Sequence, residues 1–201
     1  MADNLSQSEP FIWVSDIIEY LYCPRFIYYE RVLNIPQFQE LRTKVKIGRD
    51  IHEKKAITMG SYLRKRIGVK KKLTNIKIVS EKLHLVGILD ELLFFDDGTI
   101  GPLDYKFAQW EGVVHKPLYY QSMAYGVLAQ DLFNQPSNRG YIVYTRSSNH
   151  MERINFPPNK KERIENIVNN VMDIIFRCAY PNAKTSSKQC GDCTYRKICL
   201  K

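Results

Sequence analysis

The sequence lacks any long hydrophobic run, since no stretch approaches the roughly 20 apolar residues that a membrane-spanning helix needs. Its N-terminal stretch, MADNLSQSEPFIWVSD, carries acidic residues and lacks the basic-then-apolar order of a signal peptide. It contains no internal repeat and no G-x-x-x-x-G-K-S/T phosphate-binding motif. These absences predict a cytoplasmic protein that is not associated with a membrane. They also predict no P-loop ATPase or helicase domain.

The composition is sufficient for a folded domain. The 201 residues are 44% hydrophobic and 12% aromatic, which is enough for a real core in one domain, or in one domain with a small appendage. The formal net charge is +9 and the sequence pI is about 9.3. This charge favours a polyanionic partner, either nucleic acid or an anionic membrane surface, with solubility alone as the competing explanation.

Hydrophobic periodicity predicts helices around a sheet. Residues 11–33 are predicted to be helical, with Ser15 as the N-cap and Pro24 as a break. The other expected elements are a basic helix over 40–66, two or three strands within 69–95, a hairpin turn at 96–99, a return strand over 99–108, an amphipathic helix over 116–134, a strand over 139–148 and a helix over 159–180. This order predicts an α/β fold with a mixed sheet flanked by helices.

Polar residues interrupt the two strands on either side of the predicted hairpin turn. Asp104 and Lys106 are two positions apart and therefore face the same side of their strand. A strict two-residue loop would pair Glu91 with Asp104 and turn Asp90 to the other face. One extra residue, in the loop or as a bulge near 101–102, would bring Asp90 beside Asp104. We predict this irregularity.

Two carboxylates held about 5 Å apart on neighbouring strands repel each other unless a cation lies between them. Oxygen ligands suit Mg²⁺ or Mn²⁺, which can activate a bound water and polarise a phosphate. Lys106 can stabilise the attacking water or the charge on the phosphate. The pattern Asp…Asp-x-Lys thus indicates a phosphodiesterase site, and a surface ion pair on an edge strand is the alternative.

Two further motifs make the sequence resemble the RecB-like branch of the PD-(D/E)xK nucleases. GRDIH places Gly48 and His52 one turn apart on a helix ahead of the sheet, and QSMAY places Gln121 and Tyr125 one turn apart on the helix after it. The sequence has Asp104 where many relatives have Glu, and either carboxylate binds a hard cation. The resemblance implies a restriction-endonuclease-like fold and metal-dependent DNA cleavage.

The resemblance also implies a role for each motif residue. The implied ligands of the divalent ion are His52, Asp90, Asp104 and the main-chain carbonyl of Tyr105. Lys106 is implied to support the nucleophile, and Gln121 and Tyr125 to hold DNA near the ion.

Four of the five cysteines form a split pattern. Cys190, Cys193 and Cys199 make a C-x₂-C-x₅-C run, and Cys23 is the candidate fourth ligand. Four thiolates suit either Zn²⁺ or an iron–sulfur cluster, and the spacing does not separate the two. Cys178 lies on an apolar helix and is predicted to be a buried free thiol.

The split cysteines, with Y-C-P-R-F-x-Y-Y near the start, make nearly the full chain resemble the CRISPR-associated RecB-like iron–sulfur exonuclease family. This resemblance favours a 4Fe–4S cluster over a 2Fe–2S cluster or zinc. It implies an N-terminal helical segment over 1–40 with one cluster cysteine, a nuclease core over 41–180 and a C-terminal iron–sulfur tail over 181–201.

The activity that the resemblance implies is metal-dependent cleavage of single-stranded DNA, 5′ to 3′, which trims prespacer ends during CRISPR adaptation. CRISPR integrase subunits are then the expected protein partners, and self-association stays open. Two alternatives remain: a RecB-like nuclease of DNA repair or recombination, and a non-catalytic DNA-binding subunit of an integrase complex.

The basic segment 44–72 is expected to contact DNA, because a basic groove with aromatic faces holds single strands without sequence preference. The tyrosines and phenylalanine around Cys23 could add such faces, but core packing is the stronger interpretation for them.

Overall fold

The computed structural model describes residues 10–37, 67–183, 186–191 and 193–199. The expected basic helix over 40–66 lies outside these ranges. The described elements are β1 (Ile12–Trp13), α1 (Val14–Tyr22), α2 (Arg25–Ile27), η1 (Tyr28–Val32), β2 (Val69–Ser80), β3 (Leu85–Phe95), β4 (Ile100–Lys106), α5 (Lys116–Phe133), β5 (Arg139–Tyr144), β6 (His150–Asn155), α6 (Lys160–Arg177) and α7 (Ser187–Gly191).

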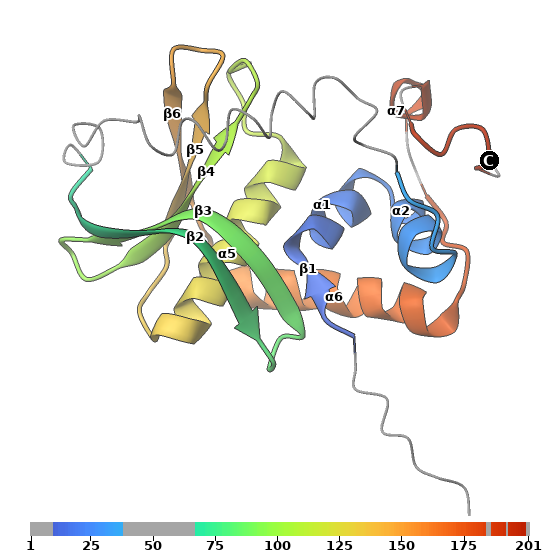
Figure 1. Cartoon of the computed structure of the whole chain (residues 1–201), viewed down its shortest axis with the longest axis horizontal. Helices are drawn as coiled ribbons and strands as arrows, with labels where there is room; N and C mark the ends of the chain where they lie inside the picture. The colour runs from blue at the N-terminus through green and yellow to red at the C-terminus, as the bar shows by residue number, and fades with distance from the viewer. Residues whose placement is uncertain (1–9, 38–66, 184–185, 192, 200–201) are drawn as a thin grey trace, which may run out of the picture.

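The described strands form one mixed sheet of six, in the order β1-β3-β4-β5-β6, with β2 also paired to β3. The pairs β2–β3, β3–β4 and β5–β6 are antiparallel, and the pairs β1–β3 and β4–β5 are parallel. The crossover between the parallel strands β4 and β5 contains α5, as parallel neighbours require. The predicted α/β fold with a mixed sheet is therefore confirmed (Figure 1).

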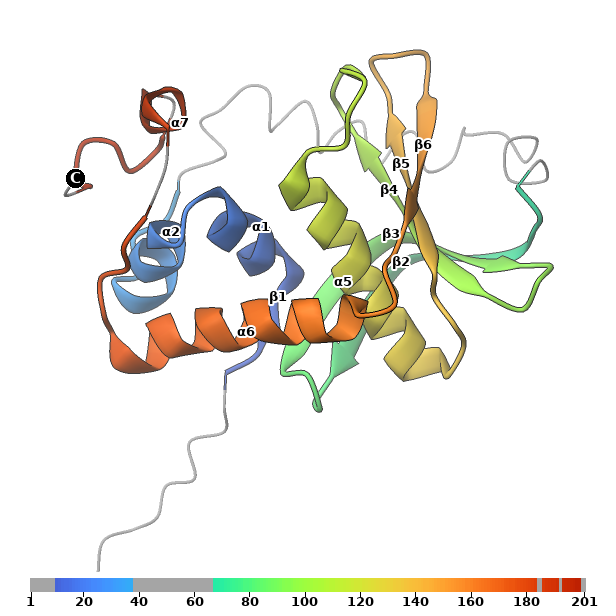
Figure 2. The same ribbon diagram turned by 180° about the vertical axis from the view of Figure 1, so that it is seen from behind.

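Helix α5 packs on the sheet, and α1 and α6 pack behind it (Figures 1 and 2). Helix α5 has Pro117 in its first turn, and its C-cap is Asn134, which takes the left-handed conformation. All residues from 121 to 129 are buried. The sequence predicted an amphipathic helix here, but the helix is covered on both sides and is therefore a central element of the core.

The N-terminal helical region differs from the prediction at its start. Ile12 and Trp13 form a short strand parallel to β3, and Trp13 rather than Ser15 is the N-cap of α1. The main-chain N–H of Trp13 donates to Asp16 Oδ2 at 2.8 Å, which closes the first turn. Pro24 separates α1 from α2, as predicted.

Helix α6, which corresponds to the helix predicted over 159–180, buries one apolar face against this core. Ile164, Val168 and Val171 are at most 4% exposed, as helical spacing requires. Strand β6 was not predicted, because its sequence HMERIN contains few β-forming residues.

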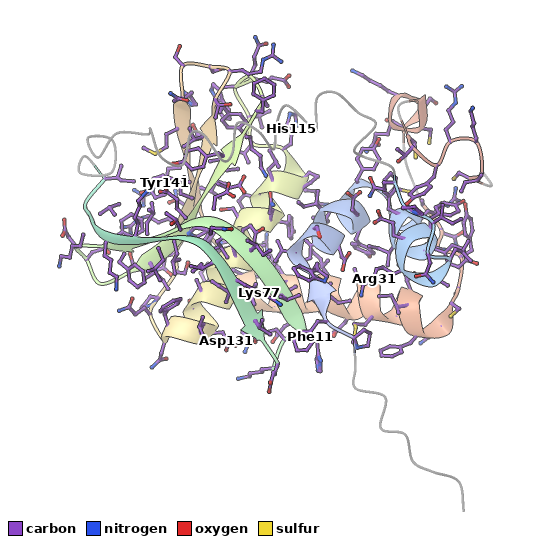
Figure 3. The ribbon with its side chains drawn as sticks, in the orientation of Figure 1. Phe11, Arg31, Lys77, His115, Asp131 and Tyr141 are labelled. Carbon is purple, nitrogen blue, oxygen red and sulfur yellow. The ribbon has the colours of Figure 1, made fainter. Side chains whose placement is uncertain are left out.

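A side-chain contact also joins α5 to the sheet. Asp131 of α5 accepts a hydrogen bond from Ser80 at the end of β2 (Figure 3).

The C-terminal tail lies beside α2, so the described N- and C-terminal segments meet (Figures 1 and 2). The Tyr22 hydroxyl donates to the Gln189 carbonyl at 3.0 Å, and the Tyr195 hydroxyl donates to the Ile35 carbonyl at 2.7 Å. In the part of the chain that the structure describes, no helix has the length and apolar character to span a membrane.

Candidate active site and cysteine cluster

The hairpin between β3 and β4 has the register that brings Asp90 beside Asp104. The Phe95 N–H donates to the Thr99 carbonyl at 2.9 Å, which leaves three residues, 96–98, in the loop. Gly98 has φ +78°, the left-handed value that a three-residue hairpin loop needs at this position. The predicted extra residue therefore lies in the loop, and the ladder then runs without a break from Phe94↔Ile100 to Glu91↔Leu103.

Asp90 lies where β3 changes neighbours. The pairing with β4 ends at Glu91, and the pairing with β1 covers only Leu85 and Val86. Asp90 therefore lies at the point where β4 leaves β3. The next step of the β3–β4 register sets Asp90 opposite Asp104.

The second acidic residue is tied to the first through the main chain. The Tyr105 N–H donates to Asp90 Oδ2 at 2.9 Å. Asp104 is 7% exposed, and its Oδ2 lies 2.7 Å from Lys106 Nζ. Because a buried carboxylate needs a compensating charge, Lys106 stabilises the Asp104 anion.

The residues of α5 complete this face of the sheet. Gln121 and Tyr125 are 8% and 7% exposed. Burial raises the pKa of Tyr125, and the charges of Asp104 and Asp90 add to this, whereas a hydrogen bond from Gln121 opposes it. The site thus lies between the strands and α5. It brings together groups that are far apart in the sequence: the two carboxylates, Lys106 and the Gln-x-x-x-Tyr pair.

The remaining predicted ligand, His52, lies outside the described residues, as does most of the basic segment 44–72. Within the described ranges, no group of three or more His, Cys, Asp and Glu side chains is arranged to hold a metal ion. Asp90 and Asp104 nevertheless fit a divalent ion chemically, since they present hard oxygen donors from adjacent strands to one side. The last implied ligand is the main-chain carbonyl of Tyr105, which follows Asp104 directly in β4.

The sequence did not identify Tyr144, which lies next to these residues. In the sheet register Tyr144 is paired with Lys106 of β4 and with His150 of β6. Burial raises its pKa, and so do the charges of Glu152, Asp104 and Glu111. An aromatic residue at the end of a β-rich run is typical of core packing, so the sequence carries no signal that distinguishes this tyrosine.

Three of the four split cysteines, Cys23, Cys193 and Cys199, lie in one cluster where the described N- and C-terminal segments meet. Cys23 is buried in a cluster with Phe26, Tyr29 and Tyr195, against which Cys193 and Cys199 pack. Burial raises the pKa of the Cys23 thiol.

The Cys199 thiol has an environment suited to a thiolate. Tyr180 Oη and Arg25 Nη1 each lie 3.4 Å from its Sγ. Burial acts to raise the pKa of Cys199, but hydrogen bonds from Tyr180, Arg25 and Tyr29 outweigh this and lower it. Since metals bind the thiolate form, these residues fit a metal or an iron–sulfur cluster.

The predicted burial of Cys178 was wrong, although its thiol is free. Cys178 is exposed, because α6 ends one residue earlier and Cys178 is its C-cap with φ +50°. The apolar face of α6 stops before this position, so the thiol turns out of the core.

Comparisons with known proteins agree with this geometry. Residues 55–200 match the PD-(D/E)XK nuclease superfamily. The chain is 25% identical over 205 residues to the CRISPR-associated exonuclease Cas4 of Francisella tularensis subsp. novicida (strain U112), covering 99% of this chain and 98% of that protein.

Its fold is similar to the crystal structure of SSO0001, with a TM-score of 0.62 and 18% identity, covering 96% of this chain and 87% of that one. The resemblance to CRISPR-associated RecB-like nucleases, inferred from the sequence motifs, is thus confirmed. The chain belongs to the PD-(D/E)XK nuclease superfamily.

Proposed function

We propose that the protein is a metal-dependent deoxyribonuclease that degrades single-stranded DNA from the 5′ end and trims prespacer ends in CRISPR adaptation. The observation that carries this proposal is the meeting of Asp90, Asp104 and Lys106 on one face of the sheet beside Gln121 and Tyr125. The full-length similarity to a CRISPR-associated exonuclease supports exonuclease activity and a role in a CRISPR system.

Asp90, Asp104, His52 and the Tyr105 carbonyl are the proposed ligands of Mg²⁺ or Mn²⁺. When bound, such an ion supplies charge stabilisation to a phosphate and an activated water. Lys106 remains close to the reacting phosphate through its 2.7 Å contact with Asp104 and offers a cationic donor to the charge that develops there. Gln121 and Tyr125 hold the DNA strand over the two carboxylates.

The cysteine cluster is proposed to bind a 4Fe–4S cluster through Cys23, Cys190, Cys193 and Cys199, with a 2Fe–2S cluster or zinc as alternatives. Its support is the packing of Cys23 with Cys193 and Cys199 and the thiolate-stabilising contacts of Arg25 and Tyr180. The proposed role is structural: it fastens the segment 1–40 and the tail 181–201 to the nuclease core 41–180. A reducing cytoplasm, where thiols persist, is the matching compartment.

The experiment is cleavage of single-stranded DNA labelled at the 5′ or the 3′ end, with Mn²⁺ or with a chelator. Wild type should release the 5′ label in short products from the start, and the chelator should stop this release. Asp104→Asn should abolish cleavage, because the site loses one of its two carboxylates.

Asp96→Asn is the matched control, since it makes the same change in the exposed loop of the same hairpin and should cleave as wild type does. DNA binding without cleavage by wild type would instead support a non-catalytic DNA-binding subunit. Activity of Asp104→Asn equal to wild type would disprove the site. Copurification of integrase subunits with the tagged chain would distinguish the adaptation role from repair or recombination.

A further inference from the structure

Tyr144 is a buried residue with a polar hydroxyl that is paired in register with the proposed catalytic lysine. Tyr144 is the last residue of β5, and the parallel pairing of β4 with β5 sets it opposite Lys106. This pair lies two residues along the strands from the pair of Asp104 and Ile142. Directly paired residues point to the same side of a sheet, so Tyr144 shares the face of Lys106 and Asp104. Its exposed fraction is 2%.

The hydroxyl of Tyr144 has no hydrogen-bond partner among the described residues. A buried hydroxyl without a partner is unfavourable, and native proteins rarely keep one without a reason. A tyrosine of ordinary pKa, about 10, is protonated at neutral pH and therefore offers an O–H donor. Such a donor suits an anionic oxygen that arrives from outside the chain.

The ring of Tyr144 is held in place from one side. Trp110 lies with its ring centroid 5.0 Å from that of Tyr144 and stacks on His150 at 4.9 Å. The main-chain N–H of Trp110 donates to Ser147 Oγ at 2.8 Å, which fixes the loop that carries the indole. A donor fixed in this way loses little freedom when it binds a ligand, which is the requirement for electrostatic stabilisation of a reacting group.

We propose that the Tyr144 hydroxyl donates a hydrogen bond to a non-bridging oxygen of the phosphodiester that the enzyme cleaves, beside Lys106. Tyr144 is then a further catalytic residue, and this assignment rests on the proposed nuclease function. The phosphate oxygen would supply the acceptor that the described protein atoms do not provide.

The test compares Tyr144→Phe with wild type on single-stranded DNA with Mn²⁺. This change removes only the hydroxyl and keeps the ring against Trp110. The turnover number should fall about a hundredfold to a thousandfold, as for the loss of one donor to a developing charge. The KM for DNA and the midpoint of thermal unfolding should stay near the wild-type values.

Tyr141→Phe is the matched control. Tyr141 lies on the same strand, is 4% exposed and packs in the core on the opposite face of the sheet (Figure 3). It should cleave at the wild-type rate.

A second measurement does not depend on how much of the variant is folded. DNA with a phosphorothioate at the cleaved position, as separate diastereomers, replaces either non-bridging oxygen by a poorer acceptor. Wild type should be slowed more than Tyr144→Phe by one diastereomer, because only wild type has a hydrogen bond there to lose.

Equal turnover numbers for wild type and Tyr144→Phe, or the same diastereomer ratio in both, would overturn the assignment. Absence of cleavage by wild type, or unchanged cleavage by Asp104→Asn, would instead overturn the proposed function and the assignment that rests on it.

Discussion

At the scale of single residues, the neighbouring carboxylates Asp90 and Glu91 have opposite environments. Asp90 is half-buried at the edge of the proposed site and accepts the Tyr105 N–H. Glu91 is 0% exposed and faces the other side of the sheet, where it lies 2.8 Å from Lys72 Nζ and 3.2 Å from the Tyr105 hydroxyl. Tyr105 thus connects the two carboxylates, through its main chain on one face and its side chain on the other.

We predict that Glu91→Gln destabilises the protein by about 2 kcal/mol, because it removes the buried charge that pairs with the half-buried Lys72 and weakens the acceptor of the Tyr105 hydroxyl. Urea unfolding followed by circular dichroism measures this difference. Glu162→Gln, on the exposed first turn of α6, is the control and should change stability by no more than about 0.5 kcal/mol. Equal effects of the two substitutions would show that the buried pair contributes nothing specific.

At the scale of elements, the loop of the β3–β4 hairpin sets the register on which the site depends. Asp97 organises this loop: its Oδ1 accepts from the Thr99 N–H at 3.0 Å and the Thr99 hydroxyl at 2.6 Å, and its Oδ2 lies 2.9 Å from Arg139 Nη2. The hydrogen bonds from Thr99, with the charge of Arg139, lower the pKa of Asp97 from its ordinary value of 3.8 to about 2. The folded hairpin therefore stabilises the ionised form of Asp97.

This shift predicts a pH-dependent contribution to stability. Because the pKa of Asp97 is lower in the folded state, its contribution is present above pH 3.8 and is lost as the pH falls toward about 2. The difference in unfolding free energy between wild type and Asp97→Asn should therefore shrink over this range. In a Thr99→Val background the pH-dependent part should be smaller, since the hydroxyl donor is gone. A difference that stays constant down to pH 2 would contradict this account of the loop.

At the scale of the whole molecule, the described N- and C-terminal segments contact each other around Cys23, Cys193 and Cys199. The Arg25 Nε donates to the Pro181 carbonyl at 3.1 Å, and the Tyr29 and Tyr195 rings stack at 4.6 Å. These contacts link segments more than 150 residues apart in sequence. A cluster ligated from both ends would restrict the unfolded chain and stabilise the fold by several kcal/mol in simple loop-closure models.

We predict that Cys190→Ser loses the brown colour and the bound iron of anaerobically purified protein and lowers the unfolding midpoint, whereas Cys178→Ser keeps all three at wild-type values. Cys178 is a suitable control because its thiol is exposed at the end of α6 and donates to the Ile175 carbonyl at 3.4 Å. Colourless wild-type protein with stoichiometric zinc would rule out the iron assignment and keep the tetrahedral thiolate site.

Sequence patterns predicted much of the fold because they act locally. The spacing of Asp104 and Lys106 fixes a shared face in any strand, and Pro24 interrupts a helix in any context. The burial of α5 on both sides was missed, because a single helix does not record how many layers cover it. Strand β6 was missed because it forms by pairing with β5 rather than through its own β propensity.

The sequence by itself determined the chemical groups of the proposed site and their order along the chain, together with the need for one extra residue in the hairpin. Only the tertiary structure decided that this residue lies in the loop, that Asp90 rather than Glu91 faces Asp104, and that Tyr144 lies beside Lys106. Periodicity fixes the face of a side chain within its own strand, whereas strand register and the parallel pairing of β4 with β5 arise from contacts between distant segments.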